Sequence, residues 1–169
     1  MARRVILGLL MLVLSTAPAM AVGAIEVGVL LFRVPDAWVQ IPAAGHRVAA
    51  FEVPTEHGSA IVTFDRIPDA SASAVTASWA ELFEEAPEDI VQKSWTERIA
   101  DCPVHFARLY GAWRGGDGIG PGKVSMATAL FESRRGLVLV RLLGQPDAVE
   151  AAAGTFLSVV KRGEDGWKP

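Results

Sequence analysis

The side chains best suited to nucleophilic chemistry are the single cysteine of the chain and a histidine close to it. Cys102 precedes His105 by three residues, with Pro103 between them. A cysteine nucleophile needs its thiolate within hydrogen-bond reach of an imidazole base. In an extended segment the two side chains point to opposite faces and do not meet, unless the bend at Pro103 changes their direction. The sequence favours a buried structural thiol, and we predict no catalytic residue.

The three histidines are the other candidates for a reactive or metal-binding site. No pair among His46, His57 and His105 has the short spacing of a zinc motif, and no second cysteine could complete a ligand set. The start of a strand accounts for His46 and a surface loop for His57. We expect neither a metal site nor a cofactor.

Three arginines stand within otherwise apolar runs. They are Arg47, Arg108 and Arg141, the last of which interrupts VLVRLL. Each could point to a solvated face or lean over a sheet with its stem buried. The alternative is that two of them line a groove for an anionic ligand or a partner carboxylate, because a guanidinium presents a fork of donors. All three are therefore candidate ligand- or partner-binding residues.

The glycine-rich run GGDGIGPGK (115–123) has some features of a phosphate-binding loop. Such a loop needs a glycine where Asp117 stands and a serine or threonine where Val124 stands, and a helix must follow it. A strand is expected here instead. We interpret residues 115–122 as a flexible hairpin connection, with partner contact as the other possibility.

The tryptophans supply further candidate contact residues. Trp38 and Trp113 are candidates for partner binding, since an exposed tryptophan beside an apolar patch marks an interface. Trp38 follows a Pro-Asp-Ala turn and could instead close the end of a sheet. Trp79 lies on the apolar stripe of a predicted helix and belongs to the core, whereas Trp95 stays open.

The N-terminal residues have the composition of a secretory signal peptide. Basic MARR precedes the apolar run VILGLLMLVL, and Ala19 and Ala21 stand at the −3 and −1 positions of a cleavage site. The apolar run is shorter than the roughly 20 residues that span a bilayer. We predict that residues 1–21 are removed and that the mature chain is exported to the periplasm or outside the cell, in soluble form.

The mature chain is expected to be one acidic domain. Loss of Arg3 and Arg4 changes 16 basic and 19 acidic residues to 14 and 19, a net charge of −5. A domain of this kind lacks the basic patch that nucleic acids require. One cysteine forms no internal disulfide, and no later segment is apolar enough to span a membrane.

Hydrophobic periodicity predicts strands in two groups, each followed by a helix. The first group comprises 27–35, a short run after the turn at 36–38, and the runs 46–54 and 59–68 around a hairpin loop at 55–58. The second group comprises 104–113, 123–133 and 136–144, for which antiparallel pairing is natural because the connections are short. In HRVAAFEVP, alternation indicates a strand covered on both faces.

Two segments have the apolar stripe of an amphipathic helix. Residues 71–86 form the first, which is expected to end at Pro87. The second follows Asp147, a possible cap paired with Glu150, and ends near Gly163. The sequence thus predicts one α+β domain over residues 22–163, in the order βββ-α-βββ-α, with a loose tail at 164–169.

This order, with particular residues at its joints, resembles the PsbP-like family, whose fold is shared with a Ran-binding nuclear import factor. The bacterial exported members are the most similar. The matching residues, within about 30–161, are PDAW (35–38), HRVAAF (46–51), Trp79, Phe83, Gly111, RLLG (141–144), Pro146 and Phe156. The resemblance implies a central antiparallel sheet of about six strands with helices on its faces. It also implies a role in binding or stabilising other proteins, but it places no ligand or contact residue here.

We therefore expect an exported, non-catalytic binding domain for another envelope protein. The alternative is an enzyme, or a binder of a small anionic ligand, that uses a cleft between helix and sheet. Two convergent arginines and a histidine in a deep pocket would favour that alternative.

Overall fold

The computed structural model describes residues 23–166, with the side chain of Gln92 left out. The predicted signal peptide and the last three residues of the tail lie outside this range. Within it, no helix is long and apolar enough to cross a membrane.

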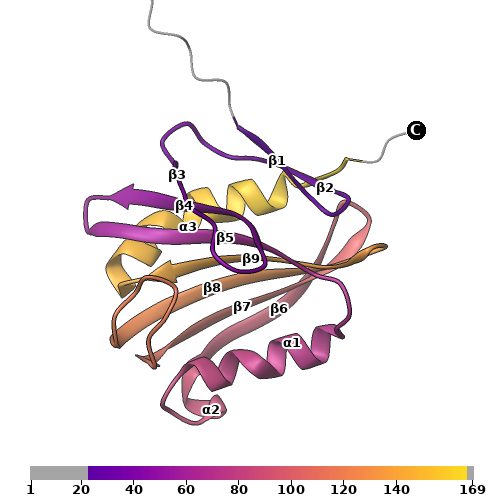
Figure 1. Cartoon of the computed structure of the whole chain (residues 1–169). Coiled ribbons are helices and arrows are strands. Elements are labelled where there is room, and N and C mark those ends of the chain that lie inside the picture. The colour runs from indigo at the N-terminus through magenta and orange to yellow at the C-terminus, as the bar shows by residue number, and fades with distance from the viewer. Residues whose placement is uncertain (1–22, 167–169) are drawn as a thin grey trace, which may run out of the picture.

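A seven-stranded antiparallel sheet forms the centre of the molecule (Figure 1). Its order is β3-β4-β5-β9-β8-β7-β6. The strands are β3 (Val39–Ile41), β4 (Arg47–Thr55), β5 (Gly58–Ile67), β6 (Val91–Ile99), β7 (Cys102–Trp113), β8 (Gly122–Ser133) and β9 (Gly136–Gly144). The predicted α+β class with an antiparallel sheet is confirmed.

The additional strand is β6, which the hydrophobic pattern did not indicate. Its sequence, VQKSWTERI, places charged and polar residues between its few apolar ones. An edge strand pairs on one side only and keeps polar groups in solvent, so it needs no continuous apolar run. β6 pairs with β7 along nearly its whole length, from Val91 opposite Leu109 to Ile99 opposite Cys102.

A second, three-stranded sheet joins the two ends of the described chain. It contains β1 (Ala24–Val27), β2 (Leu30–Arg33) and β10 (Glu164–Asp165). The prediction of one strand over 27–35 is wrong, because Gly28 turns the chain at φ +65° and makes a hairpin. The prediction of a loose tail is also wrong at its start, where Glu164 and Asp165 pair with β2.

The first predicted helix is shorter than its apolar stripe. α1 (Ala72–Ser78) is capped by Ser71, continues as the 3₁₀ turn η1 (Trp79–Leu82), and gives way to extended backbone at Phe83. There the chain pairs with the end of β7, through a bridge between Phe83 and Trp113. Pro87 does not end that helix but begins the short α2 (Pro87–Ile90). Tertiary pairing therefore overrides the helical period.

The last helix, α3 (Pro146–Lys161), starts one residue before the predicted cap. Pro146 occupies its first turn, where a missing N–H costs nothing. Asp147 therefore lies inside the first turn and is not the cap; Gln145 stands at the cap position and makes no side-chain capping bond.

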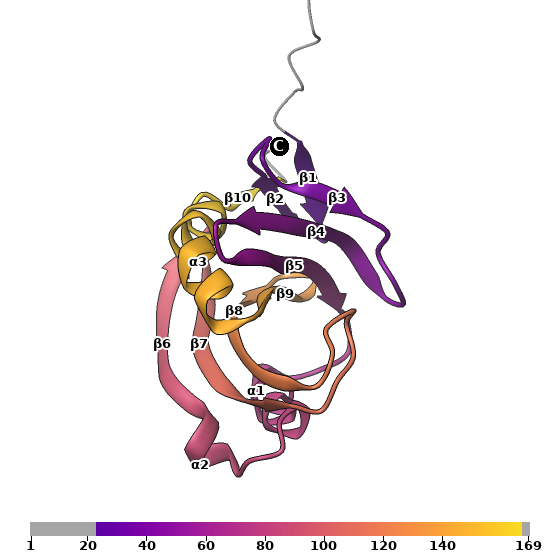
Figure 2. The ribbon, with the colours of Figure 1, turned by 90° about the vertical axis from the view of Figure 1, so that its left-hand side faces the viewer.

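The curved sheet separates two hydrophobic clusters (Figures 1 and 2). One lies under α3 and the small sheet and includes Phe32, Phe64, Phe131 and Phe156. The other lies under α1 and η1 and includes Trp79 and Trp113. These helices flank opposite faces of the sheet (Figure 1).

β4 is covered fully on one face only. Ala49, Phe51 and Val53 point into the cluster under α3, whereas Val48 is 44% exposed and Glu52 is exposed. The prediction that both faces of HRVAAFEVP are covered is wrong for Val48, because α1 packs over the far end of the sheet. A register shift between Arg47 and Ala49 also interrupts the pairing with β5.

Candidate functional site

Arg47 and Arg141 converge on the sheet face that α3 does not cover. Arg47 begins β4 and pairs with Asp65 of β5, while Arg141 in β9 pairs with Thr63 of β5. Residues two apart in a strand face the same side, so β5 aligns the two arginines. Their side chains are only 17% and 11% exposed. Both aliphatic stems are thus largely buried, and both guanidinium groups reach the same place on this face.

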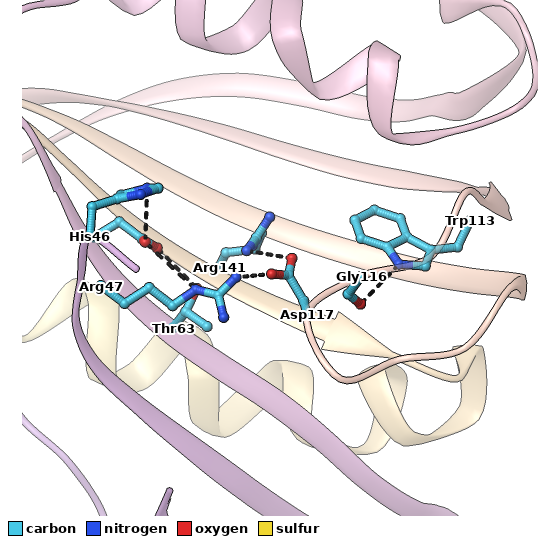
Figure 3. Close-up of polar contacts among 8 residues, drawn as sticks. His46, Arg47, Thr63, Trp113, Gly116, Asp117 and Arg141 are labelled. Atoms are coloured by element: carbon cyan, nitrogen blue, oxygen red, sulfur yellow. Dashed lines mark hydrogen bonds and ion pairs between the residues drawn. The ribbon is translucent and has the colours of Figure 1, made fainter. Parts of the chain in front are cut away.

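The group between the two guanidiniums is the carboxylate of Asp117 (Figure 3). Its Oδ2 lies 2.8 Å from an Nη of Arg141, and its Oδ1 pairs with an Nη of Arg47. Asp117 comes from the glycine-rich connection between β7 and β8 (115–122), far from both arginines in sequence. We call Arg47, Arg141, Asp117 and Asp65 the arginine centre.

Asp65 supplies the second negative charge from within the sheet. It is buried, and its Oδ2 accepts a hydrogen bond of 3.0 Å from the Thr63 hydroxyl. Its Oδ1 lies 3.9 Å from Nε of Arg47 and 3.6 Å from Nε2 of His46. The His46 ring is 80% exposed. His46 therefore borders the centre from solvent.

Burial disfavours the charged form of both arginines. It lowers the pKa of both Arg141 and Arg47, and the positive charge of Arg141 lowers that of Arg47 further, while Asp65 raises both. Arginine still carries its charge at physiological pH. Within residues 23–166, the Nε of Arg141 is buried and lacks a hydrogen-bond partner. The centre thus keeps one unused donor.

The connection that carries Asp117 is held by few contacts. The indole N–H of Trp113 donates to the Gly116 carbonyl at 3.3 Å, and the Ile119 N–H donates to the same oxygen at 3.0 Å. Asp117 itself has φ +59°, in the left-handed region that favours glycine. Asp117, the residue that departs from the phosphate-loop pattern, is therefore the one that pairs with both arginines. No local motif indicates this pairing.

The other candidate residues lie elsewhere. Arg108 in β7 projects on the α3 side and pairs with Glu150 of that helix. Trp38 is buried against Phe51, with ring centroids 6.1 Å apart, as expected if it closes the sheet end. Trp113 is buried against Phe83 and also holds the connection. Both tryptophans contribute to the core.

The cysteine and its neighbouring histidine do not meet. Cys102 is buried and its thiol donates to the Ile99 carbonyl at 3.1 Å, while burial raises the pKa of the thiol. His105 points to the other face of β7, where it contacts Thr96 and Glu132. Among the described residues no group of three potential ligands could hold a metal ion.

A second feature is an apolar cleft between α1–η1 and the β6–β7 edge, whose lining residues the sequence did not indicate. Its volume is about 530 Å³. Trp79 and Ala77 line it from the helical side, Ala107 and Leu109 line it from β7, and Val91, 45% exposed, stands at its border. Sequence reasoning did not place these residues together because it missed β6, one of the walls of the cleft.

The chain segment next to this cleft is acidic. The chain from η1 to α2 carries five acidic residues, four of them exposed, namely Glu81, Glu84, Glu85, Glu88 and Asp89. Pro87 and Val91, which line the cleft, lie within or next to this stretch. The apolar cleft and this acidic stretch therefore adjoin.

No protein-family model matches the chain, and no curated protein matches it. Among solved structures, cyanobacterial PsbP (CyanoP) from Synechocystis sp. PCC 6803 is similar, with a TM-score of 0.54, 12% identity and coverage of 90% of this chain and 98% of that one. LpqN, involved in cell envelope biogenesis of Mycobacterium tuberculosis, has a TM-score of 0.49, 10% identity and coverage of 80% and 82%. PA94 from Pseudomonas aeruginosa, a protein of unknown function, has a TM-score of 0.45, 15% identity and coverage of 87% and 96%.

The similarity to CyanoP extends over nearly the whole of both chains. At this level of identity it concerns the fold alone. The chain has the PsbP-like fold, as the resemblance in its sequence implied.

Proposed function

We propose that this chain is an exported, non-catalytic accessory domain that binds an extended, positively charged segment of an envelope protein. The segment lies in the cleft between α1 and β6. The observation that carries the proposal is the position of the apolar cleft directly beside an edge strand.

The cleft offers apolar surface that a partner would remove from water. Trp79, Ala107 and Leu109 form its apolar wall, with Ala107 and Leu109 on the face of β7 that α1 covers. Exposed Val91 adds aliphatic surface beside it. Removing apolar surface from water contributes about 25 cal/mol per Å², which a partner must set against the entropic cost of association.

β6 supplies the hydrogen bonds that an extended segment needs. It pairs with β7 only, so among the described residues one of its edges has no strand partner. A peptide that adds to such an edge gains main-chain hydrogen bonds, and its alternate side chains enter the neighbouring pocket. Here those side chains would enter the apolar cleft.

The acidic stretch next to the cleft selects the charge of the bound segment. Four exposed carboxylates between Glu81 and Asp89 attract a cationic partner and repel an anionic one. Apolar side chains alternating with lysine or arginine would therefore satisfy both the cleft and the acidic stretch.

A non-catalytic role agrees with the burial and the contacts of the cysteine, the side chain best suited to act as a nucleophile. The Cys102 thiol is buried, bonded to a carbonyl and away from His105. The similarity of LpqN and CyanoP to this chain does not transfer their roles, but a protein of the envelope is the partner that an exported domain would meet.

The test uses two nine-residue peptides, matched in length to β6, with valine alternating with lysine in one and with glutamate in the other. We expect the valine–lysine peptide to bind the mature protein at least about tenfold more tightly, and its affinity to fall when salt rises from about 0.05 to 0.5 M. Hydrogen–deuterium exchange should show new protection in β6.

A pair of variants on α1 locates the site. Ala77→Arg puts a cation into the cleft, whereas Ala74→Arg puts one on an exposed position outside it. Binding should weaken in the first variant and persist in the second. Equal binding of both peptides, or equal effects of both variants, would refute the proposal. A dimer of the free protein that Ala77→Arg dissociates would make a second copy the occupant instead.

A further inference from the structure

The arginine centre is a separate site, on strands that take no part in the cleft of the proposed function. It combines two largely buried arginines with two carboxylates, of which Asp65 lies in the sheet and Asp117 in a connection outside it. Arg47 and Arg141 are fixed by two strands of the sheet, but Asp117 reaches them from a connection rich in glycine. Four of those glycines, Gly115, Gly116, Gly120 and Gly122, have open space around the position of a β-carbon. The cations thus lie on paired strands, while their anion lies on a connection with open space beside most of its glycines.

The charges of the centre balance only while Asp117 is in place. Two arginines face two carboxylates, Asp65 and Asp117. Withdrawal of Asp117 would leave two positive charges and one negative charge in a largely buried position, which favours an incoming anion. The unpartnered Nε of Arg141 adds a donor that Asp117 does not use.

The geometry favours a carboxylate over a phosphate. Asp117 already shows that the space between the guanidiniums accepts one planar carboxylate, with one oxygen for each arginine. Asp65 lies 3.9 Å from Nε of Arg47 and would repel the second charge of a phosphate. A singly charged ligand replaces Asp117 without adding negative charge.

A hollow next to the centre has room for the rest of such a ligand. It measures about 380 Å³ and is lined by Ile61 of β5 and by Gly118 and Ile119, which directly follow Asp117. Ile61 lies two residues before Thr63 on the same face, which corresponds to about 7 Å along the strand. A short aliphatic chain attached to the carboxylate would reach this hollow.

We propose that Asp117 is an internal counterion that a small aliphatic carboxylate displaces, and that Arg47 and Arg141 form the binding site for that ligand. The carboxylate takes the place of the Asp117 side chain between the two guanidiniums, and its chain enters the hollow beside Ile61. The connection at 115–122 moves when the ligand binds.

The indole N–H signal of Trp113 in a two-dimensional ¹H–¹⁵N NMR spectrum reports this movement, because that group donates to Gly116. The folded mature protein is titrated with sodium acetate, sodium butyrate, sodium phosphate and sodium chloride at equal ionic strength. We expect saturable shifts with acetate and butyrate only. Butyrate should bind more tightly, by up to about fourfold for each methylene that is buried.

Variants separate the parts of the proposal. In Asp117→Asn the internal competitor loses its charge, and asparagine tolerates a positive φ, so the midpoint of the butyrate titration should fall at least about tenfold. Arg141→Gln should abolish the response, with Arg47→Gln as the substitute if that variant does not fold. Arg108→Gln, in an ion pair on the other face, should leave it unchanged.

An unchanged Trp113 signal in both the wild type and Asp117→Asn would overturn the proposal. Equal responses to phosphate and carboxylates, or equal midpoints with and without the Asp117 charge, would also overturn it. Because the peptide assay reads the cleft and this titration reads Trp113, failure of one proposal leaves the other intact.

Discussion

At the scale of single residues, Glu85 shows how one carboxylate can join three elements. Both of its oxygens accept the Ala112 N–H of β7, at 2.7 and 3.0 Å, and Oε1 also pairs with Lys123 of β8. The hydrogen bond from Lys123, followed by that from Ala112, lowers the pKa of Glu85 below its ordinary value of 4.5. The carboxylate therefore stabilises the fold in its charged form.

This shift predicts a pH dependence of stability. A folded-state pKa below the unfolded one contributes stability above pH 4.5, and that contribution is lost as the pH falls through the folded value. Glu85→Gln should lower Tm at neutral pH, and the difference from wild type should narrow below about pH 4. Thermal unfolding measured between about pH 3 and pH 7 tests this. Glu88→Gln, at an exposed position of the same acidic stretch, is the control; a difference that stays constant with pH would contradict the prediction.

Alternation along strands decides which arginines act together. Arg108 and Arg141 both interrupt apolar runs, and neither run says which face is covered. In the sheet, Arg141 pairs with Thr128 and Arg108 with its neighbour Ala127, so the two side chains point to opposite faces. Register is thus the physical reason why Arg47 meets one of them and not the other.

At the scale of elements, the turn from η1 into α2 packs closely against β7 at Gly111. A β-carbon there would lie 2.8 Å from a Glu85 oxygen and 3.0 Å from side-chain atoms of Ile90 and Phe83. Any residue other than glycine at position 111 would therefore push this turn away from the strand. The glycine is required by close approach of neighbouring groups.

Gly111→Ala is expected to destabilise the protein by about 1–3 kcal/mol, as overpacking of a core does. Gly120→Ala, where no atom lies within 4 Å of the added carbon, is the matched control and should have little effect. Urea denaturation gives both free energies of unfolding. Equal stabilities of the two variants would show that the turn adjusts without cost.

At the scale of the whole molecule, the two proposed sites occupy the two halves of one sheet. The cleft adjoins β6 and β7, whereas the arginine centre lies on β4, β5 and β9. Both are on the side that α3 does not cover, because α3 and the small sheet bury the opposite face. The fold thus leaves one face for binding and uses the other for its main core.

Export is the prediction that concerns the chain as a whole. When the full chain is produced in a bacterium with a secretion system, the recovered protein should lack residues 1–21 and begin at Val22. N-terminal sequencing and intact mass would establish the cleavage site. Changing Ala19 and Ala21 to arginine should leave the precursor uncleaved, and an uncleaved cytoplasmic wild type would contradict the prediction.

Local sequence patterns are sufficient to predict the elements whose residues interact with near neighbours or repeat with a clear period. The strands at 104–113, 123–133 and 136–144 and the helix after 146 follow from alternation and from the apolar stripe, and the α+β class follows from their order. The absence of contact between Cys102 and His105 also follows from alternation in one strand, and burial is the usual state of a lone thiol.

The remaining features depend on pairing between distant segments, so they follow from the folded molecule and not from any local pattern. β6 becomes a strand by pairing with β7, and the helical stripe after Ser78 is broken by pairing with the end of β7. The arginine centre needs β4, β5 and β9 in register and a connection from β7–β8 folded over them. Local sequence specifies the backbone preference of a segment and which of its side chains share a face. The contact of two arginines with Asp117 depends on the register between distant strands, and no single segment contains that information.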